Sequence, residues 1–235
     1  MFRRDHHRRI AEVLLQLDPR VLGERGCLFG VGTAIALRYG EFRESVDIDF
    51  LVSNLEGYRD LRQIIRQASS LKPIFHNQGC TIMEEREPLM DQYGIRTRLN
   101  VGGETIKFEI VLEGRVRLNP PSPEDTVCAV PCLTLVDMAC SKLLANSDRW
   151  NDDGVFSRDL LDLAHLPLKQ NQLINALSKA EGAYGESVQK DLIESLERLL
   201  GRAGWLERCR QALKIEEPKA VLWQKLIGLK RQIPA

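Results

Sequence analysis

Two aspartates one residue apart, Asp47 and Asp49, are the residues of this chain whose type and spacing most directly suggest chemistry. Apolar residues occupy every second position from 46 to 52, and polar residues fill 45, 47 and 49. This period of two predicts a half-buried β-strand with both carboxylates on its polar face. Side chains two positions apart on a strand are rooted about 6.6 Å apart, so both carboxylates could bind one metal ion.

The carboxylate pair is also an electrostatic problem. Two negative charges about 5 Å apart repel each other by roughly 3 kcal/mol at an effective dielectric constant of about 20. We therefore expect a cation between Asp47 and Asp49. The alternative is that the two aspartates form only a solvated strand face, but the spacing and the turn that precedes them favour metal binding.

A glycine turn, Gly30-Val31-Gly32-Thr33, precedes the aspartates and opens a helix predicted over 34–39. The N–H groups at the start of a helix bind phosphate, although most glycine turns are only turns. The third glycine of a dinucleotide-binding fingerprint is missing. Together with the carboxylates, the turn predicts a phosphate cradle facing a magnesium site, an arrangement that suits nucleotide chemistry.

Two alternating segments flank Gly102-Gly103 and predict a β-hairpin with a tight turn. The implied register places Glu109 opposite Arg96 and Lys107 opposite Arg98 on the polar face. Glu109 could therefore be a third metal-binding carboxylate, or it could form an ordinary cross-strand ion pair with Arg96.

The proline-rich stretch 119–123 is the best candidate for a linker. We expect an α+β chain: a mixed sheet with flanking helices over 1–120, then a helical bundle over 121–235. Equal numbers of basic and acidic residues, 33 each, argue against holding nucleic acid mainly by bulk charge. No apolar signal core or 18-residue apolar run is present, so we expect a cytoplasmic protein that does not span a membrane.

Four motifs follow one another along the chain: Gly-x-Gly-Thr-Ala at 30–34, Arg-x-Ser-x-Asp-x-Asp at 43–49, a lysine motif at 139–145 and Arg-Asp-x-x-Asp-Leu at 158–163. In this order they resemble the motifs of the AbiEii/AbiGii toxin family, which belongs to the nucleotidyltransferase superfamily built on the DNA polymerase β-like fold. The resemblance covers about residues 25–166. The family usually has two adjacent glycines before the Thr or Ser, and here Val31 takes the first place.

The resemblance implies a nucleotidyltransferase fold, with a helical domain that contributes a lysine and aspartates to the site. It implies transfer of a nucleotide from an NTP to an acceptor with release of pyrophosphate, aided by two magnesium ions. The acceptor would be RNA, for example the acceptor end of tRNA, and the protein would be a toxin paired with an antitoxin. The implied residues are Asp47, Asp49, Lys142, Asp159 and Asp162 for catalysis, Gly30, Gly32, Thr33, Ser45 and Lys142 for the nucleotide, and Asp47, Asp49 and Glu109 for the metal.

Each assignment has an ordinary alternative. Lys142 could extend its stem through apolar neighbours to reach water, and Asp159 and Asp162 could only stabilise a helix dipole. His6 and His7, flanked by arginines, predict a solvated terminus or, less strongly, an RNA contact. The whole chain could instead modify a small molecule such as an antibiotic, or be a non-catalytic nucleotide- or partner-binding scaffold.

Overall fold

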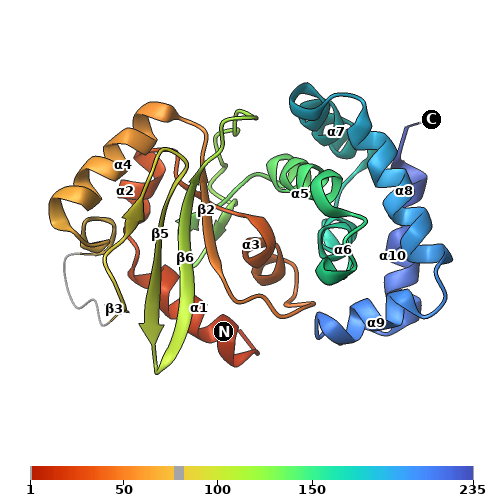
Figure 1. The fold of residues 1–235 in the computed structure, drawn as a ribbon, viewed down its shortest axis with the longest axis horizontal. Helices are drawn as coiled ribbons and strands as arrows, with labels where there is room; N and C mark the ends of the chain where they lie inside the picture. Colours follow the sequence, from red (N-terminus) through yellow and green to blue (C-terminus); the bar gives the residue numbers. More distant parts are fainter. Residues whose placement is uncertain (1, 77–81, 235) are drawn as a thin grey trace. The chain divides into compact units, whose positions relative to one another are not determined.

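The computed structural model describes residues 2–76 and 82–234, which form two compact units (Figure 1). The strand-rich unit consists of residues 1–38 and 45–134, and the helical unit consists of residues 39–44 and 135–235. The sequence places the boundary at residue 120, whereas the structure keeps 121–134 with the strands. The reason is backbone pairing with β1 (Leu28–Phe29), because Leu133 N–H donates to the Phe29 carbonyl (2.9 Å) and the backbone of Cys132 forms an isolated β-bridge with that of Phe29.

A mixed sheet in the order β1-β2-β6-β5-β3 organises the strand-rich unit. Strand β2 runs antiparallel to β1 and parallel to β6, and β5 runs antiparallel to β6. The strands of this sheet are β1 (Leu28–Phe29), β2 (Ile48–Val52), β3 (Met83–Glu84), β4 (Leu89–Met90, paired with β5), β5 (Gly94–Val101) and β6 (Glu104–Leu112).

The predicted hairpin register is confirmed, with Arg96 opposite Glu109 and Arg98 opposite Lys107. The predicted start of β2 is wrong, because the strand begins at Ile48 and Val46 is 43% exposed. Two histidine side chains occupy the backbone groups that a longer ladder would use. Ser45 N–H donates to His7 Nε2 at 3.0 Å, and the Val46 carbonyl lies 3.1 Å from His6 Nε2.

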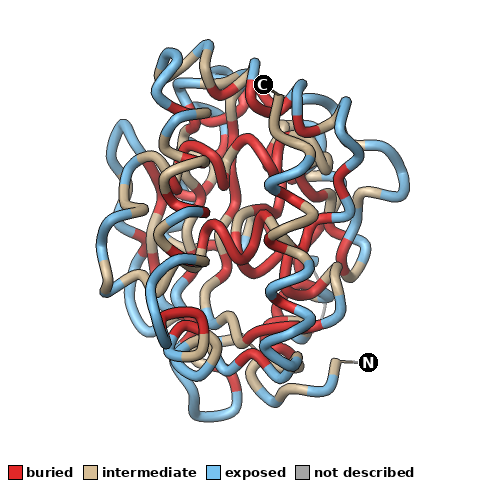
Figure 2. Tube along the Cα trace, turned by 90° about the vertical axis from the view of Figure 1, so that its right-hand side faces the viewer, coloured by how far each residue is buried: buried red, intermediate tan, exposed pale blue. Residues whose placement is uncertain are grey.

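One face of the sheet forms the core of the strand-rich unit, and Figure 2 shows buried stretches alternating with exposed ones along the chain. Phe29, Phe50 and Phe108 are fully buried, with neighbouring ring centroids 5.4 and 5.6 Å apart. The other face carries the polar residues of β2, β5 and β6. The unit also contains α1 (Asp5–Gln16), α2 (Pro19–Glu24), α3 (Val31–Arg38), α4 (Leu55–Ala68), the 3₁₀ turn η1 (Lys72–Ile74) and a small hairpin of β7 (Thr126–Val127) and β8 (Val130–Pro131).

The helical unit is built from α-helices, as the sequence predicts for the part of the chain after residue 120. Leu192, Leu196 and Leu199 form the buried stripe expected of α8. The mixed sheet and these helices confirm the α+β prediction. The helices are α5 (Leu135–Arg149), α6 (Arg158–His165), α7 (Gln170–Tyr184), α8 (Ser187–Gly201), α9 (Trp205–Ala212) and α10 (Lys219–Gln232), with the 3₁₀ turn η2 (Asp153–Val155).

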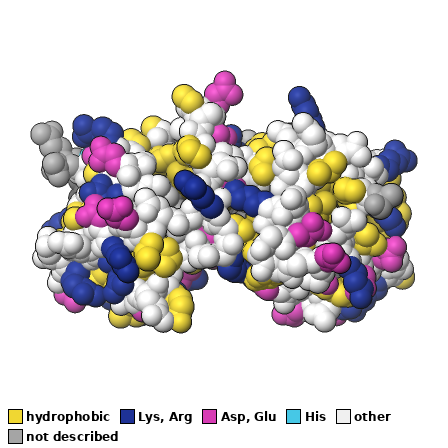
Figure 3. All heavy atoms as spheres, turned by 90° about the horizontal axis from the view of Figure 1, so that it is seen from above, with side chains coloured by type: hydrophobic (Ala, Val, Ile, Leu, Met, Phe, Trp, Pro, Cys, Tyr) yellow, Lys and Arg dark blue, Asp and Glu magenta, His cyan; other side chains and the backbone are white. Residues whose placement is uncertain are grey.

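Basic and acidic side chains alternate over the face that Figure 3 presents, in keeping with the balanced composition. Among residues 2–76 and 82–234, the structure contains no helix with the length and apolar character needed to cross a bilayer.

Candidate active site

The glycine turn lies directly against the strand that carries the two aspartates. Gly30 follows β1, and its N–H donates to the carbonyl of Asp49 at 3.0 Å. Helix α3 begins at the next residue, so its unpaired N–H groups start beside β2. The turn and the carboxylate strand therefore form one local structure, as the sequence predicted.

Thr33 and Ser45 are brought together by this turn, with their hydroxyl oxygens 2.7 Å apart. His7, from α1, accepts the backbone N–H of Ser45 and is fully buried. The prediction of a solvated terminus is therefore wrong for His7. The sequence carried a usable signal, because His7 is spaced three and seven residues from Ile10 and Leu14 and so lies on the apolar face of its helix.

The turn itself is constrained by sterics as well as by any ligand. A Cβ at Gly30 would lie 2.5 Å from the Leu133 side chain, so any larger residue there would force the buried Leu133 to shift. Val31 adopts φ +60°, a left-handed conformation that costs an L-residue with a side chain roughly 1–2 kcal/mol. The family's usual glycine at this place would carry no such cost.

Substituting Val31 with glycine should therefore stabilise the protein. Relief of the left-handed strain outweighs the extra chain entropy of glycine, about 0.5–1 kcal/mol, so we expect a net gain of about 1 kcal/mol. Urea unfolding of V31G and wild type measures it. The control is Val221→Gly, at a 42% exposed position within α10, which should lose stability by about 1 kcal/mol. A loss of stability in V31G would contradict the strain argument.

Asp49 lies directly opposite Glu109 in the parallel register of β2 and β6. Asp47 precedes the strand, and all three acidic residues are half-buried. Two cationic side chains hold Glu109: Lys107 Nζ lies 2.8 Å from Oε2, and Arg96 Nε lies 3.3 Å from Oε1. The predicted ion pair between Glu109 and Arg96 is therefore confirmed.

Lys107 places a positive charge close enough to Asp47 and Asp49 to attract both, where the repulsion between the two carboxylates led us to expect a cation. Partial burial lowers the pKa of Lys107, but its hydrogen bond to Glu109 and its attraction to Glu109, Asp49 and Asp47 raise the pKa above the usual lysine value. The Lys107 ammonium therefore offsets part of the negative charge of these three carboxylates. The sequence placed Lys107 on this face without assigning it a role.

The donor chemistry of Asp47 and Asp49 suits magnesium, which commonly binds one or two carboxylates together with substrate phosphates. No group of three or more His, Cys, Asp or Glu side chains within the described ranges is arranged to hold a metal. Glu109, turned toward Lys107 and Arg96, does not complete a three-carboxylate site in this arrangement. The two aspartates alone fit the ion.

The remaining predicted residues lie in the helical unit, where they form a buried ion cluster. Lys142 Nζ lies 2.9 Å from Asp159 Oδ1 and 2.7 Å from Asp162 Oδ2. Arg43 forms a two-point contact with Asp162, at 2.5 and 2.8 Å, and Arg149 Nε lies 2.7 Å from Asp159. The structure thus brings Lys142, Asp159 and Asp162 together.

Burial and charge oppose each other in this cluster. Burial raises the pKa of Asp162, but Arg43 and Lys142 outweigh it and hold that pKa below the usual aspartate value. Burial likewise raises the pKa of Asp159, and Lys142 and Arg149 lower it further than burial raises it.

These contacts bear on the two ordinary alternatives, one for Lys142 and one for the aspartates of α6. Lys142 is only 1% exposed, so its stem does not extend to water. Asp159 lies in the first turn of α6, as the dipole alternative requires, but its side chain is bound by cations. The sequence assigned no role to Arg43. It is part of one of the four motifs, but the residues around it do not indicate that its partner is Asp162, which lies 119 residues away.

Comparisons with known proteins identify the family of this chain and its fold. Residues 13–227 match the model of a family described as nucleotidyl transferase AbiEii toxin, type IV toxin–antitoxin system. A nucleotidyltransferase structure from H. pylori aligns with a TM-score of 0.51 and 16% identity over 97% of this chain and 93% of its own. Helicobacter pylori JHP933 aligns with a TM-score of 0.52 and 17% identity over 97% and 90%. At these identities the alignments show a shared fold, and no curated protein matches the chain.

Proposed function

The chain belongs to the AbiEii family of nucleotidyltransferase toxins of type IV toxin–antitoxin systems, and from this premise we propose that it transfers a nucleotide from an NTP to RNA. The proposal includes magnesium as the cofactor, a tRNA acceptor end as one candidate substrate and an antitoxin as the partner of the system. The observation that carries it is the backbone hydrogen bond from Gly30 to Asp49, which holds the start of α3 beside the segment that bears the two carboxylates.

In the proposed reaction, an acceptor hydroxyl attacks the α-phosphate of the NTP, and pyrophosphate leaves. The first N–H groups of α3, with Thr33 and Ser45, would bind the triphosphate, because helix starts attract anions. Asp47 and Asp49 would hold magnesium, which when bound neutralises phosphate charge and activates the attacking hydroxyl. Positioning and charge neutralisation would supply most of the rate enhancement.

The helical cluster has a proposed supporting role. Lys142 would keep the catalytic role that the resemblance implies, and Asp159 and Asp162 would fix the lysine within the helical unit. Its ion pairs within the helical unit support the second half of this assignment, because both carboxylates contact the ammonium directly.

The proposal predicts magnesium-dependent NTP binding and labelling of RNA. Calorimetry should detect an NTP in the presence of magnesium and a much weaker signal with a chelator, because the carboxylates repel phosphate without the ion. Incubation with labelled NTP, magnesium and total RNA should transfer label to RNA. Binding that ignores magnesium would instead indicate a non-catalytic scaffold, and NTP consumption without RNA would indicate a small-molecule acceptor.

A further inference from the structure

An extended trough lies on the strand-rich unit, made of three adjoining hollows. The central hollow, of about 810 Å³, shares Arg59 and Arg62 with a second of about 420 Å³ on α4. It shares Leu55, Glu113 and Arg115 with a third of about 750 Å³. Each hollow is within the size range of a small-ligand site, so the continuous trough suits a polymer better than one nucleotide.

Positive charge is concentrated in this trough, although the chain as a whole has none in excess. Two glutamates, Glu24 and Glu113, are the acidic residues that line the three hollows. Six arginines line them: Arg59, Arg62 and Arg66 from α4, Arg96 from β5, and Arg115 and Arg117 after β6.

Most of this charge is not neutralised by the protein. Arg115 pairs with Glu113, and Arg96 pairs with Asp91 and Glu109. By contrast, the three α4 arginines and Arg117 form no ion pair with any carboxylate in the described part of the chain. The α4 arginines recur at positions i, i+3 and i+7, so they follow one helix face for about 10 Å.

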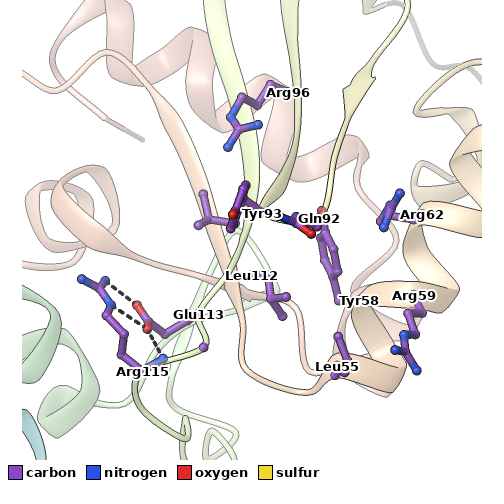
Figure 4. A pocket seen from close by; sticks show the side chains of 12 residues that line it. Leu55, Tyr58, Arg59, Arg62, Gln92, Tyr93, Arg96, Leu112, Glu113 and Arg115 are labelled. Carbon is purple, nitrogen blue, oxygen red and sulfur yellow. Dashed lines mark hydrogen bonds and ion pairs between the residues drawn. The ribbon is translucent and has the colours of Figure 1, made fainter. Parts of the chain in front are cut away.

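An exposed tyrosine, Tyr93, adds a flat surface to the arginines, and a second, buried tyrosine, Tyr58, lies beneath one of them (Figure 4). Tyr93 is 63% exposed, and the Arg62 guanidinium lies 5.8 Å from the centre of the Tyr58 ring. The Nε of Arg62 is buried and has no hydrogen-bond partner among the described residues. The exposed Tyr93 ring beside these guanidinium groups suits a ligand that carries both anionic groups and stacking groups.

We propose that this arginine trough binds single-stranded nucleic acid. Guanidinium groups bind phosphate oxygens in pairs, and exposed aromatic rings stack on unpaired bases. Arg96 lines the trough and also contacts Glu109, which lies opposite Asp49. A strand in the trough can therefore deliver its end to the carboxylates. This last step rests on the proposed transfer to RNA.

An acidic protein would use the arginines but not the exposed tyrosine, and a bilayer surface does not fit a concave trough. Both remain measurable as outcomes. The direct probe is a fluorescein-labelled single-stranded RNA of about twelve nucleotides, within the usual range of site sizes. Fluorescence anisotropy, recorded over a series of salt concentrations with a chelator and without NTP, measures binding independently of the proposed catalysis.

The test variant is the triple substitution Arg59→Gln, Arg62→Gln and Arg66→Gln. We expect its RNA affinity to fall at least about tenfold and the slope of log K against log salt to flatten by about 2, because each phosphate contact to a single strand contributes about 0.7. The matched control, Lys190→Gln with Lys219→Gln and Lys230→Gln, removes three exposed charges from the helical unit and should bind RNA as wild type does.

Tyr93→Ala tests the stacking contribution without changing charge. Its affinity for the RNA should fall about fivefold or more with an unchanged salt slope. This exposed position keeps the proposal testable if the triple variant misfolds. Magnesium-dependent NTP binding should be unchanged in both variants.

Wild-type affinity in the triple variant would overturn the trough. So would equally tight binding of polyglutamate, which would indicate an acidic protein, or of anionic phosphatidylglycerol vesicles. If the RNA binds as expected but wild-type protein neither binds NTP nor labels RNA, the proposed function fails while the nucleic-acid site stands.

Discussion

Replacing Asp162 with alanine is expected to lower the free energy of unfolding by about 3–5 kcal/mol, because the change leaves the buried Arg43 guanidinium without its carboxylate partner. Asp162 is fully buried and accepts contacts from Arg43 and Lys142, which are themselves 2% and 1% exposed. Lys142 keeps Asp159, whereas Arg43 loses its two-point contact. Urea unfolding of the variant measures the effect.

A matched control separates burial from ion pairing as such. Asp153 also lies between two arginines, Arg198 and Arg202, but its side chain is 44% exposed. Asp153→Ala should therefore cost no more than about 1 kcal/mol. The double variant Arg43→Met/Asp162→Leu removes a whole pair and should be less destabilised than Asp162→Ala. Equal losses for Asp153 and Asp162 would show that burial of the cluster has no energetic consequence.

Acid should erase part of the difference between wild type and Asp162→Ala. The pKa of Asp162 is held below its ordinary value, so its stabilising contribution is complete above the unfolded pKa of about 3.9. That contribution disappears as the pH falls through the lower folded pKa. The gap in unfolding free energy should therefore be constant near neutral pH and narrow in acid.

Replacing Asp47 with alanine should abolish RNA labelling, a fall of at least about a thousandfold, the order seen when a charged catalytic group is removed. Asp47 and Asp49 are the two carboxylates proposed to hold magnesium. With one removed, magnesium should no longer strengthen NTP binding. The transfer assay and calorimetry measure the two effects separately.

The variant should remain folded, because Asp47 is half-buried and lies outside regular structure. Its unfolding free energy without metal should change by less than about 0.5 kcal/mol. Asp60→Ala is the control: this aspartate of the same unit pairs with Arg25 and is 48% exposed. It should label RNA normally. Labelling that survives in Asp47→Ala would refute the carboxylate mechanism.

The sheet hairpin could be predicted because its information is local. Alternation fixes which face each residue occupies, and Gly102-Gly103 fixes the register, so Arg96 falls opposite Glu109 without any knowledge of the rest of the chain. The start of β2 could not be predicted in this way. It depends on His6 and His7, which bind the backbone of residues 45 and 46 from a helix about forty residues earlier.

In the candidate site, too, local features could be predicted from the sequence and contacts between distant segments could not. Motif order was enough to single out the glycine turn and the aspartates, and the hydrogen bond between Gly30 and Asp49 agrees with their pairing. The partners of these residues come from distant segments. Lys107 is one strand away from the aspartates, and Arg43 is 119 residues from Asp162, so neither contact leaves a periodic signal in the sequence.

The helical unit is not a detachable module, because the chain passes between the units after residues 38, 44 and 134. The short segment 39–44 supplies Arg43 to Asp162 and stacks Phe42 on His165, with ring centroids 3.7 Å apart. No single cut can release the helices together with these two residues. A fragment beginning at residue 135 would keep Asp162 while losing its guanidinium partner, so a helical fragment with an intact ion cluster would have to include residues 39–44.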